Sequence, residues 1–298
     1  TLLLIFDALQ SGSIKLEEDV TVSEHAASMG GSQVYLEPGE IQTVETMIKC
    51  IAVASANDAC VSMAEHIAGT EEAFVAKMNE RAAGLGMDNT HFVNCCGLDA
   101  DGHMSSARDV AVMSRELITR YPQIHQYSTV WMDTITHTTR KGTSEFGLTN
   151  TNKLIKQYQW ATGLKTGSTS KAGRCLSATA VKDNIELIAV VMTAPDSKSR
   201  FADAVSLLNY GFSSCFSYGD EEDITIPDQE ITGGVKGTVR CKAKDSFHYM
   251  FLEKPDTAKI ERRLDMNGQI QAPVEEGDVV GRVIYSYDSK DIGSVDIT

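Results

Sequence analysis

The stretch Gly163-Leu164-Lys165-Thr166-Gly167-Ser168-Thr169 leads into two runs, residues 174–181 and 185–194, that are typical of β-strands. Only Lys182-Asp183-Asn184 separates these runs, which is typical of a β-hairpin. Upstream of the stretch, apolar residues recur at helical spacing instead, and residues 197–210 carry one more helical stripe. We therefore expect an α/β (α+β) domain in which helices pack on an antiparallel sheet.

The expected helices are separated by glycines and by one polar break. Glycines follow residues 58–68 and 71–85, and Ser55-Ala56-Asn57 interrupts the apolar pattern between two helices. Residues 14–40 predict loops and short strands that close on a turn at Pro38-Gly39. The helices are expected over residues 1–10, 44–53, 58–68, 71–85, 106–120 and 197–210.

The character of the sequence changes after Gly219. Asp220-Glu221-Glu222-Asp223 predicts a charged linker, and short alternating apolar runs punctuated by Gly and Pro follow it. Such runs indicate a small all-β domain. We expect a domain over residues 1–216 and a second over 217–298. The expected strands lie at residues 224–226, 237–242, 246–252, 260–264 and 279–287.

Composition excludes several classes of partner and cofactor. The 298 residues carry a net charge of −14, which argues against nucleic acid as a partner. No apolar run is long enough to span a membrane, so membrane contact is expected only through segments outside this chain. Seven cysteines form no C-x-x-C pair, and the seven histidines form no H-E-x-x-H, so we expect no metal site and no cofactor. Cys95 and Cys96 are interpreted as small packing residues.

Two short motifs could carry chemistry. Ser55-Ala56-Asn57 is an S-x-N triplet, a pattern that arises by chance about once in a chain of this length. Its alternative interpretation is a cap for the helix that begins near Asp58. Lys165-Thr166-Gly167 is rarer, with roughly one chance occurrence in fifteen such chains. Its alternative is an exposed lysine on a turn.

In this order and setting, the motifs resemble the second and third elements of penicillin-binding proteins and class A β-lactamases, whose first element is S-x-x-K. The chain is similar over residues 1–216 to the low-molecular-mass penicillin-binding D-alanyl-D-alanine carboxypeptidases, serine peptidases of the S11 type. Residues 217–298 resemble the β-rich C-terminal domain of that family. Further similar segments are residues 32–40, 55–60, 89–92, 97–99, 106–109, 152–153, 163–169 and 172–173.

The resemblance implies the reaction and its partners. It implies hydrolysis of the terminal D-alanine from peptidoglycan stem peptides through an acyl-enzyme, acylation by β-lactam antibiotics, and an extracytoplasmic location in the cell envelope. Residues 1–8 resemble the end of the S-x-x-K motif and its helix. We therefore expect the nucleophilic serine and its lysine to lie upstream of residue 1, and the chain as given to be inactive without them.

The resemblance also implies roles for the two motifs. Ser55 would relay a proton toward the leaving D-alanine, and Asn57 would hold the substrate amide. Lys165 would supply positive potential, and Thr166 would donate to the substrate carboxylate. Gly167 would let the substrate approach an edge strand.

Two further residues complete the implied site. The backbone N–H of Ser168 would form half of an oxyanion hole. Arg200 would grip the terminal carboxylate, because a guanidinium can donate two parallel hydrogen bonds. The alternative for Arg200 is a solvated arginine at the start of a helix.

Two rival functions stay open. A class A β-lactamase would need a glutamate-bearing loop before K-T-G, and residues 145–150 are the only candidate, at unsuitable spacing. A catalytically dead cell-wall binding module is disfavoured because Ser55, Asn57, Lys165 and Arg200 occur together. A serine four to seven residues before Thr1, with a lysine three residues after it, would decide the class.

Overall fold

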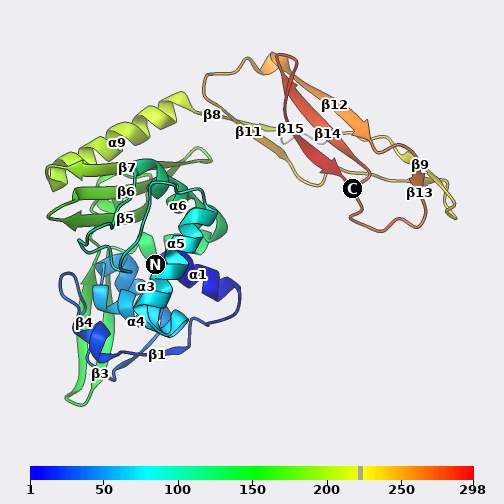
Figure 1. Cartoon of the computed structure of the whole chain (residues 1–298). Coiled ribbons are helices and arrows are strands. Elements are labelled where there is room, and N and C mark those ends of the chain that lie inside the picture. The colour runs from blue at the N-terminus through cyan, green and yellow to red at the C-terminus, as the bar shows by residue number, and fades with distance from the viewer. Residues whose placement is uncertain (221–223) are drawn as a thin grey trace. The chain divides into compact units, whose positions relative to one another are not determined.

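The computed structural model describes residues 1–220 and 224–298, and its contacts divide the chain into two compact units (Figure 1). The first unit comprises Thr1–Lys182 and Glu186–Tyr210, and the second comprises Asp183–Ile185 and Gly211–Thr298. The expected fold class is confirmed, because a unit of helices and antiparallel strands precedes an all-β unit.

The long helices of the first unit follow the predicted pattern with one exception. The helix expected over residues 44–53 ends early: α3 spans Val44–Lys49 and continues as a π-helical turn, Cys50–Ala54. Residues 24–27, 125–128 and 154–157 form four-residue helices that are too short for periodicity to reveal. The elements are α1 (Leu2–Gln10), α2 (Glu24–Ala27), α4 (Asn57–Ala68), α5 (Glu71–Gly84), α6 (Ala107–Arg120), a 3-10 turn (Pro122–Ile124), α7 (His125–Ser128) and α8 (Leu154–Gln157).

A three-stranded antiparallel sheet carries the predicted hairpin. The order is β5-β6-β7, with β5 at Ala161–Thr169, β6 at Gly173–Lys182 and β7 at Ile185–Ala194. Asp183 and Asn184 both adopt positive φ, which a two-residue hairpin turn requires. The last helix, α9 (Ser197–Ser214), runs beside these strands in Figure 1. Because β5 is an edge strand, its outer side is open to a ligand.

Helices bury the other elements that shape the site. Every residue from Asn57 to Ala64 in α4 is buried, and α1 buries Phe6 and Ile5 against the same core. Helix α6 reaches the sheet where Ser114 Oγ and Ser177 Oγ lie 2.7 Å apart. The start of α4 is therefore fixed inside the unit and is not a mobile surface turn.

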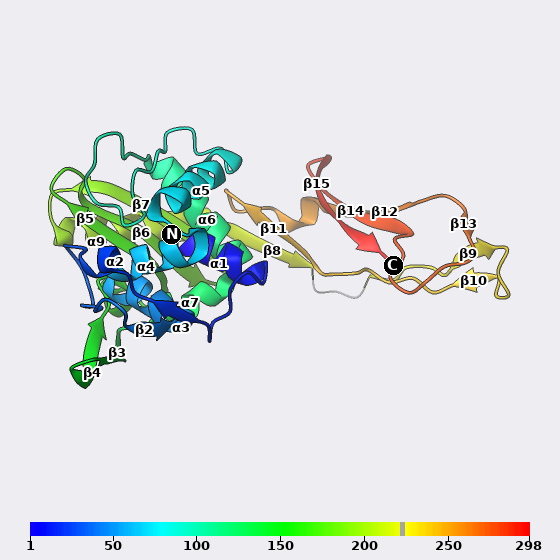
Figure 2. The ribbon, with the colours of Figure 1, turned by 60° about the horizontal axis from the view of Figure 1, so that its bottom comes forward.

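Two smaller hairpins complete the first unit. Strands β1 (Asp19–Thr21) and β2 (Ile41–Thr43) pair within the region expected to hold short strands. The pair β3 (Met132–Thr139) and β4 (Gly142–Thr149) was not predicted, because few of its side chains are apolar and only Ile135, His137 and Leu148 are buried. This hairpin extends away from the helices in both views (Figures 1 and 2).

Among its described residues, the second unit contains strands, the end of α9 at residues 211–214, and a 3-10 turn, Thr257–Lys259. The predicted linker is partly wrong: Asp220 is the last residue of β8, is buried, and accepts a hydrogen bond from Tyr285 Oη at 2.8 Å. Residues 221–223 of that linker lie outside the described residues, and 224–226 lie outside the strands. The strands are β8 (Phe216–Asp220), β9 (Gln229–Thr232), β10 (Thr238–Val239), β11 (Phe247–Phe251), β12 (Ile260–Met266), β13 (Ile270–Gln271), β14 (Gly281–Tyr287) and β15 (Lys290–Ile297).

Within residues 1–220 and 224–298, the helices are all too short or too polar to cross a lipid bilayer.

Candidate active site

Ser55 lies at the end of the π-helical turn, in a left-handed conformation with φ 61° and ψ 38°. A non-glycine residue pays roughly 1–2 kcal/mol for this conformation. The π-helical turn widens the helix and ends it, so the Ser55 side chain does not point in the direction that a continuing helix would impose. Its Oγ then accepts a hydrogen bond from Lys165 Nζ at 2.7 Å.

Asn57 is the first residue of α4, and Ala56, which has no side-chain acceptor, occupies the capping position. The capping interpretation of the triplet is therefore wrong. Asn57 Nδ2 donates to the Gly30 carbonyl at 2.8 Å, and its backbone N–H donates to the Ser32 carbonyl at 2.8 Å. A Cβ at Gly31 would lie 2.9 Å from Asn57 Nδ2, so glycine is needed for the close approach.

Asp58, the next residue of α4, binds the continuation of this segment at residues 34–36. Its buried carboxylate accepts hydrogen bonds from the backbone N–H groups of Val34 and Leu36, both at 3.1 Å. Burial raises the pKa of Asp58, although these backbone donors oppose the shift. The segment that resembled the family just before the second motif therefore supports that motif directly.

Lys165 lies within β5, so the interpretation as an exposed lysine on a turn is wrong. Its Nζ donates to Ser55 Oγ and to the Thr166 carbonyl, the latter at 3.0 Å. Burial lowers the pKa of Lys165 to about 8, and the charge of Arg200 acts in the same direction. The side chain therefore joins the two motifs and exchanges its proton near neutral pH.

Thr166 is held by a residue that the sequence did not single out. Thr166 Oγ1 and Thr151 Oγ1 lie 2.6 Å apart, and the Thr151 N–H donates to the Val53 carbonyl at 3.2 Å. Thr151 precedes the segment 152–153 that resembled a family loop. That neighbourhood was the only sequence signal for it, because an isolated threonine carries no pattern.

Arg200 is buried, with 5% of its surface exposed, so the interpretation as a solvated arginine is wrong. Its Nη1 donates to the carbonyls of Gly167 and Cys175, both at 3.2 Å, and its Nη2 donates to Ser197 Oγ at 3.0 Å. Its Nε is buried and has no hydrogen-bond partner among the described residues. Arg200 therefore braces the end of the β5–β6 pair.

Gly167 and Ser168 lie at the exposed end of β5, opposite Cys175 and Arg174 of β6. The Ser168 hydroxyl accepts a hydrogen bond from Arg174 Nη1. Two guanidinium groups, those of Arg174 and Arg200, therefore contact this strand end.

A cavity of about 740 Å³ collects the predicted residues. This volume lies within the range of small-molecule sites. The fold brings together all seven residues proposed from the sequence, and Thr151 joins them. The lining includes Ser55, Asn57, Lys165, Thr166, Gly167, Ser168 and Arg200.

Comparison with known proteins agrees with this arrangement. Residues 1–196 match the family described as D-alanyl-D-alanine carboxypeptidase, and residues 220–298 match the penicillin-binding protein 5 C-terminal domain. The D-alanyl-D-alanine carboxypeptidase DacF of Bacillus subtilis is 40% identical over 291 residues, which cover 97% of this chain and 74% of DacF.

Solved structures show the same similarity. Penicillin-binding protein 5 from Haemophilus influenzae aligns with a TM-score of 0.73 and 30% identity, covering 100% of this chain and 87% of that one. Penicillin-binding protein 6B from Escherichia coli aligns with a TM-score of 0.71 and 28% identity, covering 99% and 84%.

Fold and sequence thus define a serine hydrolase of the penicillin-binding class. The chain belongs to the D-alanyl-D-alanine carboxypeptidase family. The expected activity, serine-type D-alanyl-D-alanine carboxypeptidase, is confirmed at the level of the family. Neither the β-lactamase alternative nor the dead binding module is supported by these matches.

Proposed function

We propose that the cavity binds the D-alanyl-D-alanine end of a peptidoglycan stem peptide, and that β-lactam antibiotics occupy the same space. The contact between Lys165 Nζ and Ser55 Oγ carries this proposal, because it joins the two motifs at one point of a cavity of suitable size. The cavity concentrates cations in a chain with a net charge of −14, which suits an anionic substrate end.

The terminal carboxylate is bound by Thr166 and by the positive charge behind it. The Thr166 hydroxyl is oriented by Thr151 and can donate to a carboxylate oxygen. The Arg200 guanidinium contacts the same strand end and lines the cavity, so its positive charge faces the same space. A buried cation without a counter-ion is unfavourable, so binding an anion here relieves a cost that the free protein carries.

Ser55 and Lys165 transfer a proton to the leaving D-alanine. A pKa of about 8 leaves roughly a tenth of the Lys165 side chains neutral at pH 7. The Lys165 ammonium donates to Ser55 Oγ, so a proton can pass through the hydroxyl to the amine as the amide bond breaks. Asn57 supports the substrate amide from the other side of the cavity.

The exposed end of β5 receives the substrate backbone. Gly167 presents no side chain there, and the backbone N–H of Ser168 contributes to an oxyanion hole. In the family that the sequence resembles, the acylating serine belongs to an S-x-x-K motif, which is distinct from the two motifs joined in this cavity.

The two domains have different roles in this proposal. Residues 1–216 carry the chemistry, and residues 217–298 supply none of the residues named here. Peptidoglycan lies outside the cytoplasmic membrane, which supports an extracytoplasmic location in the cell envelope for this protein.

Arg200 provides the sharpest test of substrate orientation. In the full-length protein, Arg200→Lys should lower kcat/KM for a peptide ending in free D-Ala-D-Ala about ten-fold or more, because the guanidinium contacts are lost. The same peptide amidated at its C-terminus should already be a poor substrate and should lose little further. Arg115→Ala removes an exposed arginine of α6 and serves as the matched control.

Equal losses on the free-acid and amidated peptides would show that Arg200 braces β5 and does not read the carboxylate. A melting temperature measured on each variant separates loss of fold from loss of recognition.

Labelled penicillin tests the nucleophile independently. The adduct in the full-length protein should map to the serine of an S-x-x-K motif and not to Ser55. An adduct on Ser55 would make Ser55 the nucleophile and Lys165 its base, a pairing that their 2.7 Å separation permits. That result would overturn the relay role proposed for Ser55.

A further inference from the structure

Three thiols and a carboxylate meet beside the cavity, although the spacing of the cysteines in the sequence indicated no metal site. Cys60 comes from α4, Glu71 from the first turn of α5, and Cys95 and Cys96 from the loop before α6. One ligand atom from each of Glu71, Cys95 and Cys96 lies within 4.8 Å of the other two. We propose that Glu71, Cys95 and Cys96 bind a thiophilic divalent cation, with Zn²⁺ as the physiological ion.

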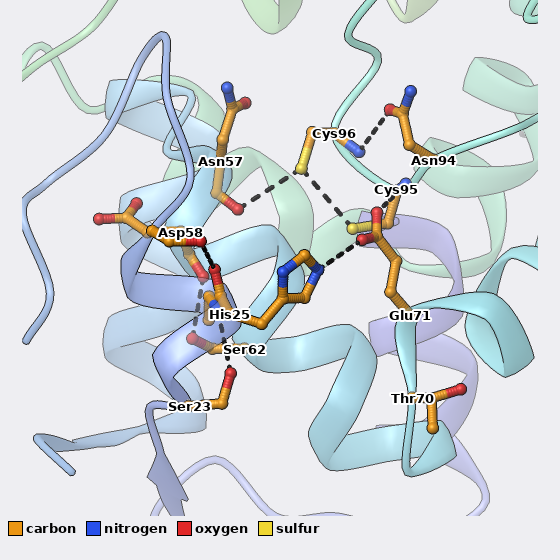
Figure 3. Close-up of polar contacts among 12 residues, drawn as sticks. Ser23, His25, Asn57, Asp58, Ser62, Thr70, Glu71, Asn94, Cys95 and Cys96 are labelled. Atoms are coloured by element: carbon orange, nitrogen blue, oxygen red, sulfur yellow. Dashed lines mark hydrogen bonds and ion pairs between the residues drawn. The ribbon is translucent and has the colours of Figure 1, made fainter. Parts of the chain in front are cut away.

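The loop is bent so that two consecutive side chains converge. Asn94 Oδ1 accepts hydrogen bonds from the N–H groups of Cys96, Gly97 and Leu98, at 3.2, 2.8 and 3.0 Å. In extended chain, neighbouring side chains would point to opposite faces. Here the two sulfur atoms lie 3.7 Å apart, as Figure 3 shows.

That separation fits a tetrahedral ion. With zinc–sulfur bonds of about 2.3 Å, two thiolates of a tetrahedral site lie roughly 3.8 Å apart. The observed 3.7 Å therefore needs almost no movement of the two sulfurs. A disulfide would require the same atoms to approach to about 2.05 Å.

Glu71 is positioned as a third ligand. Its Oε1 accepts the Cys95 N–H at 3.0 Å, and its Oε2 lies 3.1 Å from His25 Nε2 (Figure 3). Metal-binding carboxylates are commonly fixed by such outer hydrogen bonds. The Glu71 side chain is 15% exposed, so the ligand set is largely withdrawn from water.

The composition of the site selects the ion. Two thiolates favour Zn²⁺ and other thiophilic ions over Mg²⁺ or Ca²⁺, which prefer oxygen ligands alone. Cys60 is 7% exposed and lines the same cavity as Cys95 and Cys96.

The site would also fix a wall of the cavity. Cys96 Sγ lies 3.5 Å from the Asn57 carbonyl oxygen, and Cys60, Cys95 and Cys96 all line the cavity. An ion at this point would tie the loop to α5 next to the start of α4. The inference does not depend on the proposed function, because binding can be measured without substrate.

Co²⁺ added to the reduced, metal-free full-length protein provides the test. We expect one equivalent to bind, with thiolate-to-cobalt charge-transfer absorption, and Zn²⁺ to displace it. Cys95→Ser and Cys96→Ser should each abolish that absorption, and Glu71→Gln should weaken binding about ten- to a hundred-fold. Cys215→Ser changes a cysteine outside the cluster and should bind as the parent does.

Saturating Zn²⁺ should also raise the melting temperature of the parent and of Cys215→Ser, but not that of Cys96→Ser. Absence of Co²⁺ binding, equal binding by Glu71→Gln, or charge-transfer absorption that survives in Cys95→Ser/Cys96→Ser would overturn the site. So would a disulfide among these thiols in protein purified without reductant. If Cys95→Ser does not fold, Cys96→Ser and Glu71→Gln decide the outcome.

Discussion

Lys165 and Ser55 touch at 2.7 Å, yet the backbones that carry them are built differently. Lys165 sits in the middle of a regular strand whose hydrogen bonds to β6 fix its direction. Ser55 sits in a left-handed turn between a π-helical segment and α4. One side of the cavity is positioned by secondary structure, and the other by contacts between distant segments.

The side of the cavity that carries Lys165 (the strand side) and the side that carries Ser55 (the turn side) therefore depend on different parts of the molecule. On the strand side, Arg200 braces the carbonyls of Gly167 and Cys175, and the lysine itself adds little to the fold. On the turn side, Asn57 and Asp58 bind the backbone of residues 30–36, more than twenty positions earlier. Substitutions on the strand side should harm the chemistry first, whereas those on the turn side should harm the fold as well.

Lys165→Met should give the largest functional effect of the variants considered. Loss of a positioned proton-transfer group should lower kcat/KM for D-alanine release by about 10²- to 10⁴-fold. Stability should not fall in parallel, because the folded pKa of about 8 lies below the usual 10.5. A lysine whose pKa is lowered in the folded state makes its full contribution to the free energy of unfolding only above pH 10.5. That contribution is lost as the pH falls toward 8.

At pH 7 the methionine variant should therefore melt no lower than the parent, as measured by calorimetry. A melting temperature lower than that of the parent by more than about 5 °C would contradict this expectation. In a unit of this size, such a shift corresponds to roughly 1–2 kcal/mol.

Asp58→Ala should give the largest loss of stability. It leaves the buried N–H groups of Val34 and Leu36 without their acceptor, at about 1–3 kcal/mol each. We expect unfolding free energy to drop by roughly 3 kcal/mol and labelled-penicillin uptake to fall with it. Denaturant titration measures the first quantity. Asp88→Ala removes an exposed carboxylate and should stay within about 0.5 kcal/mol of the parent.

The strand side could be predicted from the sequence, and the reason lies in its regularity. The alternating runs after Gly167 fixed the hairpin, and K-T-G is rare enough to be informative by itself. Once the strand is known, Lys165 and Thr166 must point to opposite faces. Even so, the burial of Arg200 was not foreseen, because a helix-start arginine looks the same in sequence whether its partners are water or carbonyl groups.

The turn side was recognised only as a motif. Nothing local in residues 50–55 predicts a π-helical turn, since the apolar run reads as ordinary helix. The conformation of Ser55 depends on Gly30, Ser32 and Lys165, which are remote in sequence. Thr151 was missed for the same reason: its contact with Thr166 exists only after β4 and β5 are in place.

Ser55→Gly and Ser55→Ala should separate strain from chemistry. Both variants lack the hydroxyl that accepts from Lys165, so both should lose D-alanine release to a similar extent. Only glycine adopts φ 61° without steric cost, so it should be more stable than alanine by about 1 kcal/mol. Chemical denaturation of the two variants checks the difference. Equal stabilities would mean that the turn stores no strain.

Thr151→Val should give the smallest effect, and it tests how finely Thr166 is positioned. The substitution keeps the shape of the side chain but removes the 2.6 Å contact with Thr166 Oγ1. A single neutral hydrogen bond is worth about 0.5–1.5 kcal/mol, so kcat/KM should fall roughly two- to ten-fold. Because Thr151 acts by orienting the donor to the carboxylate, the loss should appear on the free-acid peptide and be absent on the amidated one. Thr134→Val, at an exposed position of β3, controls for the change of residue type. Equal losses on the two peptides would instead show that the Thr151 side chain holds β5 in place and does not orient a donor to the carboxylate.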